Sequence, residues 1–183
     1  MQASSGQLTE PALRTLLAGA TLAGTWVLDP RRSSIRLKTT ALGLFRVNGV
    51  FGEASGQGTV SADGTVSGAL SVAAASIDTR NAKRDTHLRS ADIFDSDHHP
   101  YITFTVDGIW PSGQGITVAG TLTVRDRSRP LSFDAVATVP DNGEIWLDAE
   151  ARIDRTSFGL TWTGASTSSK TSIMIVHTVF ARG

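Results

Sequence analysis

The chain of 183 residues contains no cysteine, which excludes disulfide bridges, thiolate nucleophiles and cysteine-ligated zinc sites. Charged residues make up only 19% of the chain and the formal net charge is zero, so no charge pattern favours a nucleic acid or an anionic membrane surface as a partner. No apolar run is long enough to span a bilayer. The length is that of one domain, which can bury its own core without cross-links.

Residues that suit strands and turns are abundant instead. The chain has 18 glycines, and threonine, valine and serine recur throughout. From Trp26 onward, apolar residues fall at every second position, which is typical of strands with one buried face. The predicted strands cover residues 34–38, 45–51, 66–72, 102–106, 116–124, 131–139, 145–153 and 172–181.

Turn signals separate these strands at short intervals. Asp63 with Gly64, and Asp141 to Gly143, have the composition of tight hairpin turns, and Pro130 marks another break. Short connections make sequential strands antiparallel, and eight such strands close most economically into a ring without exposed edges. We therefore predict an all-β fold, an eight-stranded antiparallel up-and-down barrel over residues 25–183.

Many residues that the predicted barrel turns inward are small. They are Gly49, Gly68, Gly120, Ala135, Ala137, Ala149 and Ala151. An eight-stranded barrel is just wide enough to be filled by side chains or to hold one small ligand. Because unfilled volume costs about 24 cal/mol per Å³, small inward residues favour an apolar cavity that a ligand occupies. The alternative is a flattened barrel whose walls touch across the small residues.

Residues 1–24 differ from the rest and form a predicted N-terminal helical arm. Leu13, Leu16 and Leu17 recur at helical spacing, and Gly24 ends the pattern. The alternative interpretation is an export signal, because residues 16–23 are apolar. That run is short, and Glu10 precedes it. We therefore expect a cytoplasmic protein, with export to the periplasm as the alternative.

One segment, residues 75–106, interrupts the strands with a predicted short helix over residues 81–90. Asp78 or Thr79 is its predicted N-cap. Asp85 and Arg89 are four residues apart and therefore lie on one polar face of the helix, while Leu88 points the other way. The insertion is the expected lid over whatever the barrel binds.

Several motifs from residue 24 to residue 182 agree in order and spacing with one known family. They are Trp26-Val-Leu-Asp-Pro30 followed by Ser33-Ser34, Gly49-Val-Phe-Gly52, Ser76-Ile-Asp-Thr79, the segment RDTHLRSADIFD over residues 84–95, Pro100-Tyr-Ile-Thr-Phe104, Gly120-Thr-Leu-Thr123 and Arg155-Thr-Ser-Phe-Gly-Leu160. On these residues the chain resembles the YceI-like family of bacterial lipocalin-fold proteins. The resemblance implies a lipocalin-like barrel that binds, carries or stores a long isoprenoid lipid, a polyprenyl phosphate or a prenylated quinone, without catalysis.

The resemblance also implies a ligand site made of the inward residues of the strands. The expected cavity-lining residues are Ile35, Leu37, Phe45, Val47, Phe51, Leu70, Phe104, Leu122, Phe133, Ala135, Leu147, Ala149 and His177. The expected head-group residues are Arg32, His87 and Arg89. Arg32 stands where the family usually has a histidine, and a permanent cation there would favour a phosphate over a neutral quinone.

A second function remains open, a hydrolase or metal-dependent enzyme that uses the cluster Asp85, His87, Asp92 and Asp95. Nothing singles out a catalytic pair in it, and the adjacent His98 and His99 point apart in a strand or turn. We therefore expect no metal and no cofactor other than a bound isoprenoid lipid. The oligomeric state is also open, and one arrangement is a homodimer in which the arm caps a neighbour's barrel.

Overall fold

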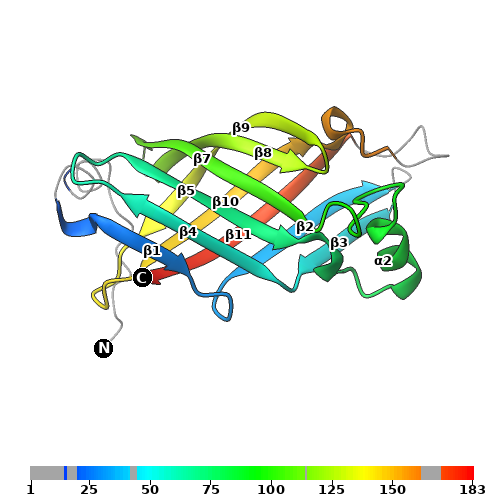
Figure 1. The fold of residues 1–183 in the computed structure, drawn as a ribbon, viewed down its shortest axis with the longest axis horizontal. Coiled ribbons are helices and arrows are strands. Elements are labelled where there is room, and N and C mark those ends of the chain that lie inside the picture. Colours follow the sequence, from blue (N-terminus) through cyan, green and yellow to red (C-terminus); the bar gives the residue numbers. More distant parts are fainter. Residues whose placement is uncertain (1–14, 16–19, 42–44, 114, 162–169) are drawn as a thin grey trace.

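The computed structural model describes residues 15, 20–41, 45–113, 115–161 and 170–183, and they form one antiparallel sheet that closes into a barrel (Figure 1). Most of the chain is strand. The strands are β1 (Gly24–Leu28), β2 (Ser34–Ala41), β3 (Phe45–Phe51), β4 (Ala54–Val60), β5 (Val66–Ala73), β6 (Ile77–Asp78), β7 (Tyr101–Ser112), β8 (Gly115–Val124), β9 (Arg127–Thr138), β10 (Ile145–Asp154) and β11 (Thr171–Arg182). The helical elements are η1 (Ala20–Leu22), η2 (Ala74–Ser76), α2 (Ala82–Arg89) and η3 (Arg155–Phe158).

Eight strands close the ring, which confirms the predicted fold. Their order is β1-β4-β5-β7-β8-β9-β10-β11, and β11 pairs back onto β1. The first half of β11 pairs instead with β2, and β3 and β6 continue the sheet from there. At one end the wall is therefore made by β2, β3 and β6, and α2 lies beside them (Figure 1).

Two strands of the ring, β1 and β4, are absent from the predicted set. In β4 the sequence ASGQGTV has too few large apolar residues to show a period of two. A glycine of the neighbouring strand nevertheless permits the pairing, because a Cβ on Gly68 of β5 would lie 2.6 Å from the Gln57 carbonyl oxygen and 2.8 Å from the Gly58 Cα of β4. The close approach of the two backbones therefore accounts for the pairing of β4 with β5.

Three of the small inward residues do not leave empty space. A Cβ on Gly49 would lie 2.8 Å from Ile77 Cδ1, and one on Gly120 would lie 2.7 Å from the Phe104 ring. At Gly68 the neighbouring backbone fills the space. The prediction that these glycines create the cavity is therefore wrong, because larger neighbours occupy the room that they provide.

The last strand, β11, turns inward the face opposite to His177, which was predicted to line the cavity. Ser172, Met174 and Val176 line the interior cavities described below, so Ile173 and Ile175 face outward. Both isoleucines are only partly exposed. They are covered because long charged neighbours on β10 and β2 flank them, and such side chains shield apolar surface with their aliphatic stems.

The insertion forms a helix close to the predicted range, and its N-cap is Asn81 instead of Asp78 or Thr79. The Asn81 side chain accepts a hydrogen bond from the Arg84 amide at 2.9 Å. Asp85 is buried, and its Oδ1 accepts bonds from the Thr79 amide at 3.0 Å and the Thr79 hydroxyl at 2.5 Å. Leu88 is buried too, as predicted. The buried carboxylate therefore ties the helix to the strand before it.

Replacing Asp85 with alanine should lower thermal stability more than it changes the binding of any ligand in the barrel. The substitution leaves buried donors on Thr79 without an acceptor, which costs about 1–3 kcal/mol. At roughly 2–4 °C per kcal/mol for a domain of this size, calorimetry should show a clear fall in Tm. The control is Asp92→Ala, because that carboxylate on the same insertion is 71% exposed. A normal melting curve with lost binding would assign Asp85 to the ligand instead.

At the other end of the barrel, the residues before β1 pack across the opening. The Trp26 indole donates to the Leu22 carbonyl at 2.8 Å, and the Arg182 guanidinium lies 4.8 Å from the Trp26 ring centre. Leu22 and Trp26 are both buried. Apart from residues 15 and 20–24, the predicted helical arm lies outside the described residues. No described helix is long and apolar enough to cross a membrane.

Candidate functional site: the apolar cavities of the barrel

Three cavities lined almost entirely by apolar residues follow one another along the barrel. We call them distal, central and proximal, with volumes of about 100, 90 and 110 Å³. Strand β11 shows their order, because Ser172 lines the distal cavity, Val176 the central one and Phe180 the proximal one. One water molecule needs about 10–15 Å³ on this scale, so each cavity is several times larger than a single water site.

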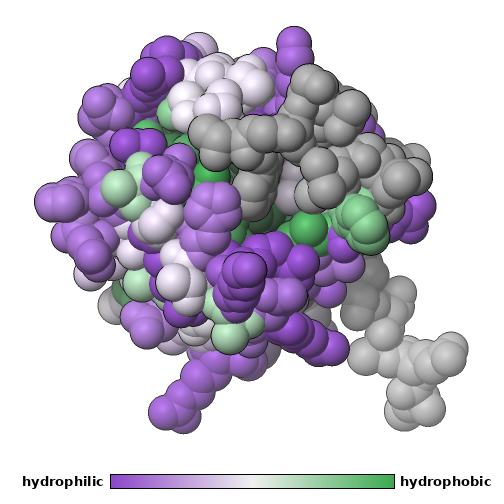
Figure 2. Space-filling model, turned by 90° about the vertical axis from the view of Figure 1, so that its right-hand side faces the viewer, coloured by the Kyte–Doolittle hydropathy of each residue, from purple (hydrophilic) through white to green (hydrophobic). Residues whose placement is uncertain are grey.

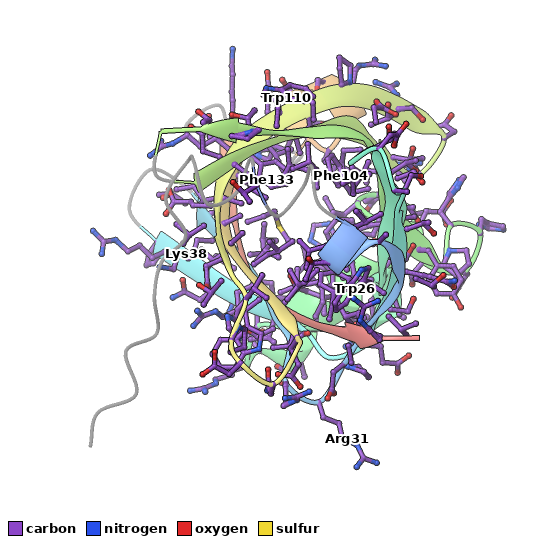
Figure 3. The ribbon with its side chains drawn as sticks, turned by 90° about the vertical axis from the view of Figure 1, so that its left-hand side faces the viewer. Trp26, Arg31, Lys38, Phe104, Trp110 and Phe133 are labelled. Atoms are coloured by element: carbon purple, nitrogen blue, oxygen red, sulfur yellow. The ribbon has the colours of Figure 1, made fainter. Side chains whose placement is uncertain are left out.

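The distal and central cavities are neighbours separated only by side chains. The residues that line both are Val72, Ile102, Leu122, Ile153 and Met174. In the central cavity the rings of Phe104 and Phe133 lie 5.4 Å apart between centroids. Figure 3 shows both rings inside the barrel, whereas Lys38 and Trp110 point away from it. Together the two cavities make one interrupted apolar channel.

The distal cavity lies at the end of the barrel that α2 covers. Phe94 from the insertion packs against Phe51 of β3, with ring centroids 6.2 Å apart, and Leu88 of α2 lines the same cavity. Figure 2 looks onto this end and shows apolar side chains recessed within a rim of polar ones. The insertion therefore forms one wall of the cavity, as expected of a lid.

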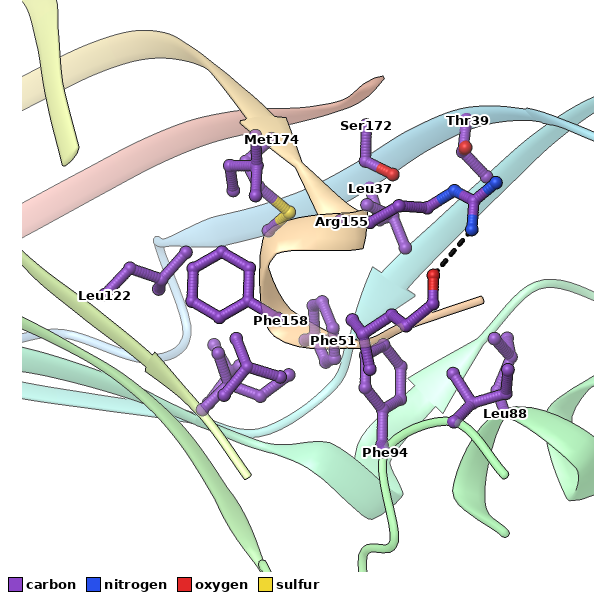
Figure 4. A pocket seen from close by; sticks show the side chains of 16 residues that line it. Leu37, Thr39, Phe51, Leu88, Phe94, Leu122, Arg155, Phe158, Ser172 and Met174 are labelled. Carbon is purple, nitrogen blue, oxygen red and sulfur yellow. Dashed lines mark hydrogen bonds between the residues drawn. The ribbon is translucent and has the colours of Figure 1, made fainter. Parts of the chain in front are cut away.

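All but three of the sixteen residues that line the distal cavity are apolar, and the three polar ones come from separate elements. They are Thr39 of β2, Arg155 of η3 and Ser172 of β11, and all three are buried. Arg155 donates from Nη1 to the Leu160 carbonyl at 2.6 Å (Figure 4). Burial lowers the pKa of the Arg155 guanidinium, and the nearby Asp154 carboxylate opposes this shift. The guanidinium stays charged at any ordinary pH.

The local sequence explains why Arg155 turns inward. The Asp154 side chain accepts a hydrogen bond from the Thr156 amide at 2.9 Å and caps η3, so the chain turns directly after β10. Gly159 ends the turn with φ +72°, a conformation that favours glycine. The tight turn between these two residues directs Arg155 and Phe158 into the barrel end.

Eight of the thirteen predicted cavity residues line one of the three cavities, two more face inward without lining one, and another is buried nearby. Leu37 and Phe51 line the distal cavity, Ile35, Leu70, Phe104 and Phe133 the central one, Leu122 both, and Leu147 the proximal one. Ala135 and Ala149 face inward in the core and also border a shallow outer concavity of about 600 Å³. Val47 is buried but lines none of the three cavities.

Two predicted cavity residues lie on the outside. Phe45 is 62% exposed at the start of β3. His177 faces outward with β10's Asp148, and its Nδ1 lies 2.7 Å from an Asp148 carboxylate oxygen. The prediction for Phe45 is wrong because it is the first residue of β3, and on that face of the strand burial begins only at Val47. The one for His177 is wrong because β11 turns its other face inward.

The three predicted head-group residues line none of the distal, central and proximal cavities. Arg32 lies on the turn after β1 and binds Asp29 at 2.8 Å and Glu144 at 2.5 Å. The bond from Arg32 holds the pKa of Glu144 down to about 2. His87 is half-buried beside Asp92, and Arg89 donates to the Ile77 carbonyl at 2.8 Å. Their charges therefore serve surface and helix contacts.

The four residues proposed for an enzyme do not converge. Asp85 bonds to Thr79 inside the fold, whereas the half-buried His87 lies near the exposed Asp92, with 3.7 Å between Nε2 and Oδ2. Asp95 bonds to His98 at 2.8 Å, which lowers the pKa of its carboxyl group. Within the described ranges, no group of three or more acidic or histidine side chains is placed to hold a metal ion.

Sequence reasoning missed the polar corner of the distal cavity. Arg155 was visible only as part of the motif over residues 155–160, to which no role was given. Thr39 alternates correctly with Leu37 in β2, but the predicted strand stops at residue 38. Ser172 was not predicted as a cavity residue because His177, on the opposite face of β11, was expected to point inward. The signal available in the sequence was the alternation of Ile35, Leu37 and Thr39, which places the threonine on the same face as the two apolar residues.

A profile of the YceI-like domain matches residues 26–180, which include nearly all of the barrel from β1 to β11. The chain belongs to the YceI-like family. Within this YceI-like group, the chain is 25% identical to Protein YceI of Escherichia coli over 153 residues, 78% of this chain and 80% of that protein. The family resemblance that the motifs predicted is therefore confirmed.

Solved structures share the fold of this YceI-like chain. Burkholderia cenocepacia BcnA superposes with a TM-score of 0.75 at 21% identity, covering 83% of this chain and 98% of that one. A domain from Saccharophagus degradans superposes with a TM-score of 0.69 at 15% identity, covering 86% and 98%. The latter is described as a polyisoprenoid binding domain implicated in plant cell wall breakdown.

Proposed function

We propose that this protein binds a polyisoprenoid chain inside the barrel and carries or stores it. The observation that supports this most is the pair of adjoining apolar cavities, distal and central, that share five lining residues and lie behind a recessed apolar surface. The Saccharophagus domain with the same fold, described as binding polyisoprenoids, supports the same ligand class.

Burial of the tail is sufficient for affinity. Each buried methylene contributes about 0.8 kcal/mol, so about ten carbon atoms supply the roughly 8 kcal/mol of micromolar binding before the cost of association is subtracted. A tail of several isoprene units therefore needs few polar contacts. This matches cavities whose linings are almost entirely apolar.

The tail requires the distal and central cavities to join. Met174 and Leu122 line both of them, so their side chains stand at the partition. Methionine is unbranched and adapts its rotamers to irregular space. We expect Met174 to move aside when the tail passes, which opens one continuous channel without a change in the strands.

Analysis of lipid that co-purifies with the protein tests the proposal. Organic extracts of protein from a bacterial host should contain a prenyl lipid at close to one molecule per chain by mass spectrometry. The control is an organic extract of the other host proteins from the same preparation, which should not contain this lipid in a stoichiometric amount. Stoichiometric metal without any prenyl lipid would support the metal-dependent enzyme and contradict the carrier.

A further inference from the structure

The wall of the barrel is split between β9 and β10. Pairing between these strands ends at Ala149 opposite Ala135. Beyond that pair, residues 127–134 pair only with β8 and residues 150–154 only with β11, and no other described strand pairs with either free edge. At the other end of the split, the turn that ends η3 lies against the side chain of Arg127. The split is therefore a slot that is bounded at both ends.

The slot opens onto the central cavity. Leu131 and Phe133 of β9 and Ala151 and Ile153 of β10 lie along its two sides, and all four line that cavity. Leu131, Phe133 and Ile153 are partly exposed although they face inward, whereas every inward residue of the neighbouring strand β8 is buried. The inner side chains are therefore accessible where the two strands part.

A concavity on the outside of the barrel leads to the same place. It has a volume of about 600 Å³, and the residues at the start of the slot, Ala135, Ala149, Asp134 and Glu150, line it. Val176 of β11 lines both this concavity and the central cavity. The outer and inner spaces therefore approach each other at the slot.

The residues that follow the last pair disfavour further pairing. If the register continued, Glu150 would lie opposite Asp134, and Asp154 would lie opposite Pro130. Both carboxylates of the first of these pairs are on the outer face, and like charges directly opposite each other destabilise antiparallel strands. Pro130 has no amide hydrogen, and proline within sheets is confined to edges. The sequence therefore favours an open slot.

We propose that this slot is the portal through which a long apolar chain enters and leaves the central cavity, sideways through the wall. The inference rests on the proposed function, since it concerns how the tail reaches its cavity. Widening the slot breaks no backbone hydrogen bond between β9 and β10, because its two edges are not paired with each other. Opening of the α2 end would instead separate and expose the buried rings of Phe94 and Phe51.

A cross-link over the slot tests the portal, and labelling is specific because the chain contains no native cysteine. The variant carries Ser132→Cys and Arg152→Cys, two exposed positions that face each other in the extended register. Bridging the thiols of the folded full chain with a bismaleimide should slow uptake and release of tritiated geranylgeraniol by about tenfold or more. Kd should stay unchanged, because a blocked portal slows both rates alike.

The matched control places the same bridge where the wall is already paired. Thr123→Cys with Ser128→Cys joins β8 to β9 at two hydroxyl groups that lie 2.8 Å apart, so the bridge should change neither rate. Unchanged rates with the slot bridged would overturn the portal and leave the proposed function intact. Failure of the unmodified protein to bind geranylgeraniol would overturn both.

A charge reversal tests the portal without a cross-link. Glu150→Lys would place an ammonium group opposite Asp134 and favour pairing across the slot, so exchange should slow severalfold at low ionic strength. Adding Asp134→Lys restores like charges at this pair and should restore fast exchange. Equal exchange rates in the unmodified protein and both variants would contradict the portal, because separation of these strands would then not limit exchange.

Discussion

Ala151→Phe should fold and bind the prenyl tail far more weakly. Ala151 is 3% exposed and lines the central cavity of about 90 Å³, so a phenyl ring there takes the space of the tail. Each methylene that the ring displaces removes about 0.8 kcal/mol, and displacing about three of them weakens Kd by roughly 60-fold. Titration with geranylgeraniol measures the loss.

The neighbouring residue provides the control for this experiment. Glu150 faces outward on the same strand, with its side chain 53% exposed, so Glu150→Phe places the same ring outside the barrel. It should leave tail affinity unchanged. Ala151→Leu should give a smaller loss, which guards against overpacking in the phenylalanine variant. Full binding by a folded Ala151→Phe protein would show that the tail does not pass through the central cavity.

Phe94→Ala should be the most destabilising single change in the insertion. Phe94 is 6% exposed and packs on Phe51 at the barrel end. Removal of a buried phenylalanine ring costs about 3–5 kcal/mol, because packing is lost and the surroundings only partly collapse. For a domain of this size the loss corresponds to roughly 6–20 °C in Tm. Denaturant unfolding and calorimetry both measure it.

Phe45→Ala is the matched control, because the same residue type is 62% exposed on β3. Truncation of an exposed ring away from other features should change the free energy of unfolding by less than about 0.5 kcal/mol. If both variants lose equally little stability, the insertion does not pack into the barrel end. That result would also contradict the assignment of the insertion as a lid.

The fold could be predicted because its strands show their period plainly. In β8 buried positions alternate with partly exposed ones over the whole strand, and in β9 the alternation covers residues 131–138, with the apolar face turned inward as the pattern predicts. The helix of the insertion follows from its break with that period. These signals are local, so they can be recognised in the sequence without knowing which strands pair with each other.

The face of β11 could not be predicted, because residues 173–176 read Ile-Met-Ile-Val and are apolar on both faces. Which face turns inward depends on the neighbouring strands, where Arg152 and Lys38 are the register partners of Ile173. The sequence of one strand does not contain this pairing register. His177 was placed wrongly for this reason, and Ser172 was overlooked.

The cavity itself was predicted partly for the wrong reason. Glycines that seemed to leave a hole accommodate Ile77 and Phe104, which arrive from distant parts of the chain. The remaining space instead lies between larger residues such as Leu122, Ile153 and Met174. The volume of a cavity is the volume enclosed by the strands minus the volume of the side chains inside it. Only the three-dimensional packing determines that difference.

A crystal structure of the protein purified together with its bound lipid tests the central claim most directly. The account predicts continuous electron density for a prenyl tail that runs from the distal cavity past Met174 and Leu122 into the central cavity. Tail density on the outer face of the barrel, with the interior closed by protein side chains, would contradict it.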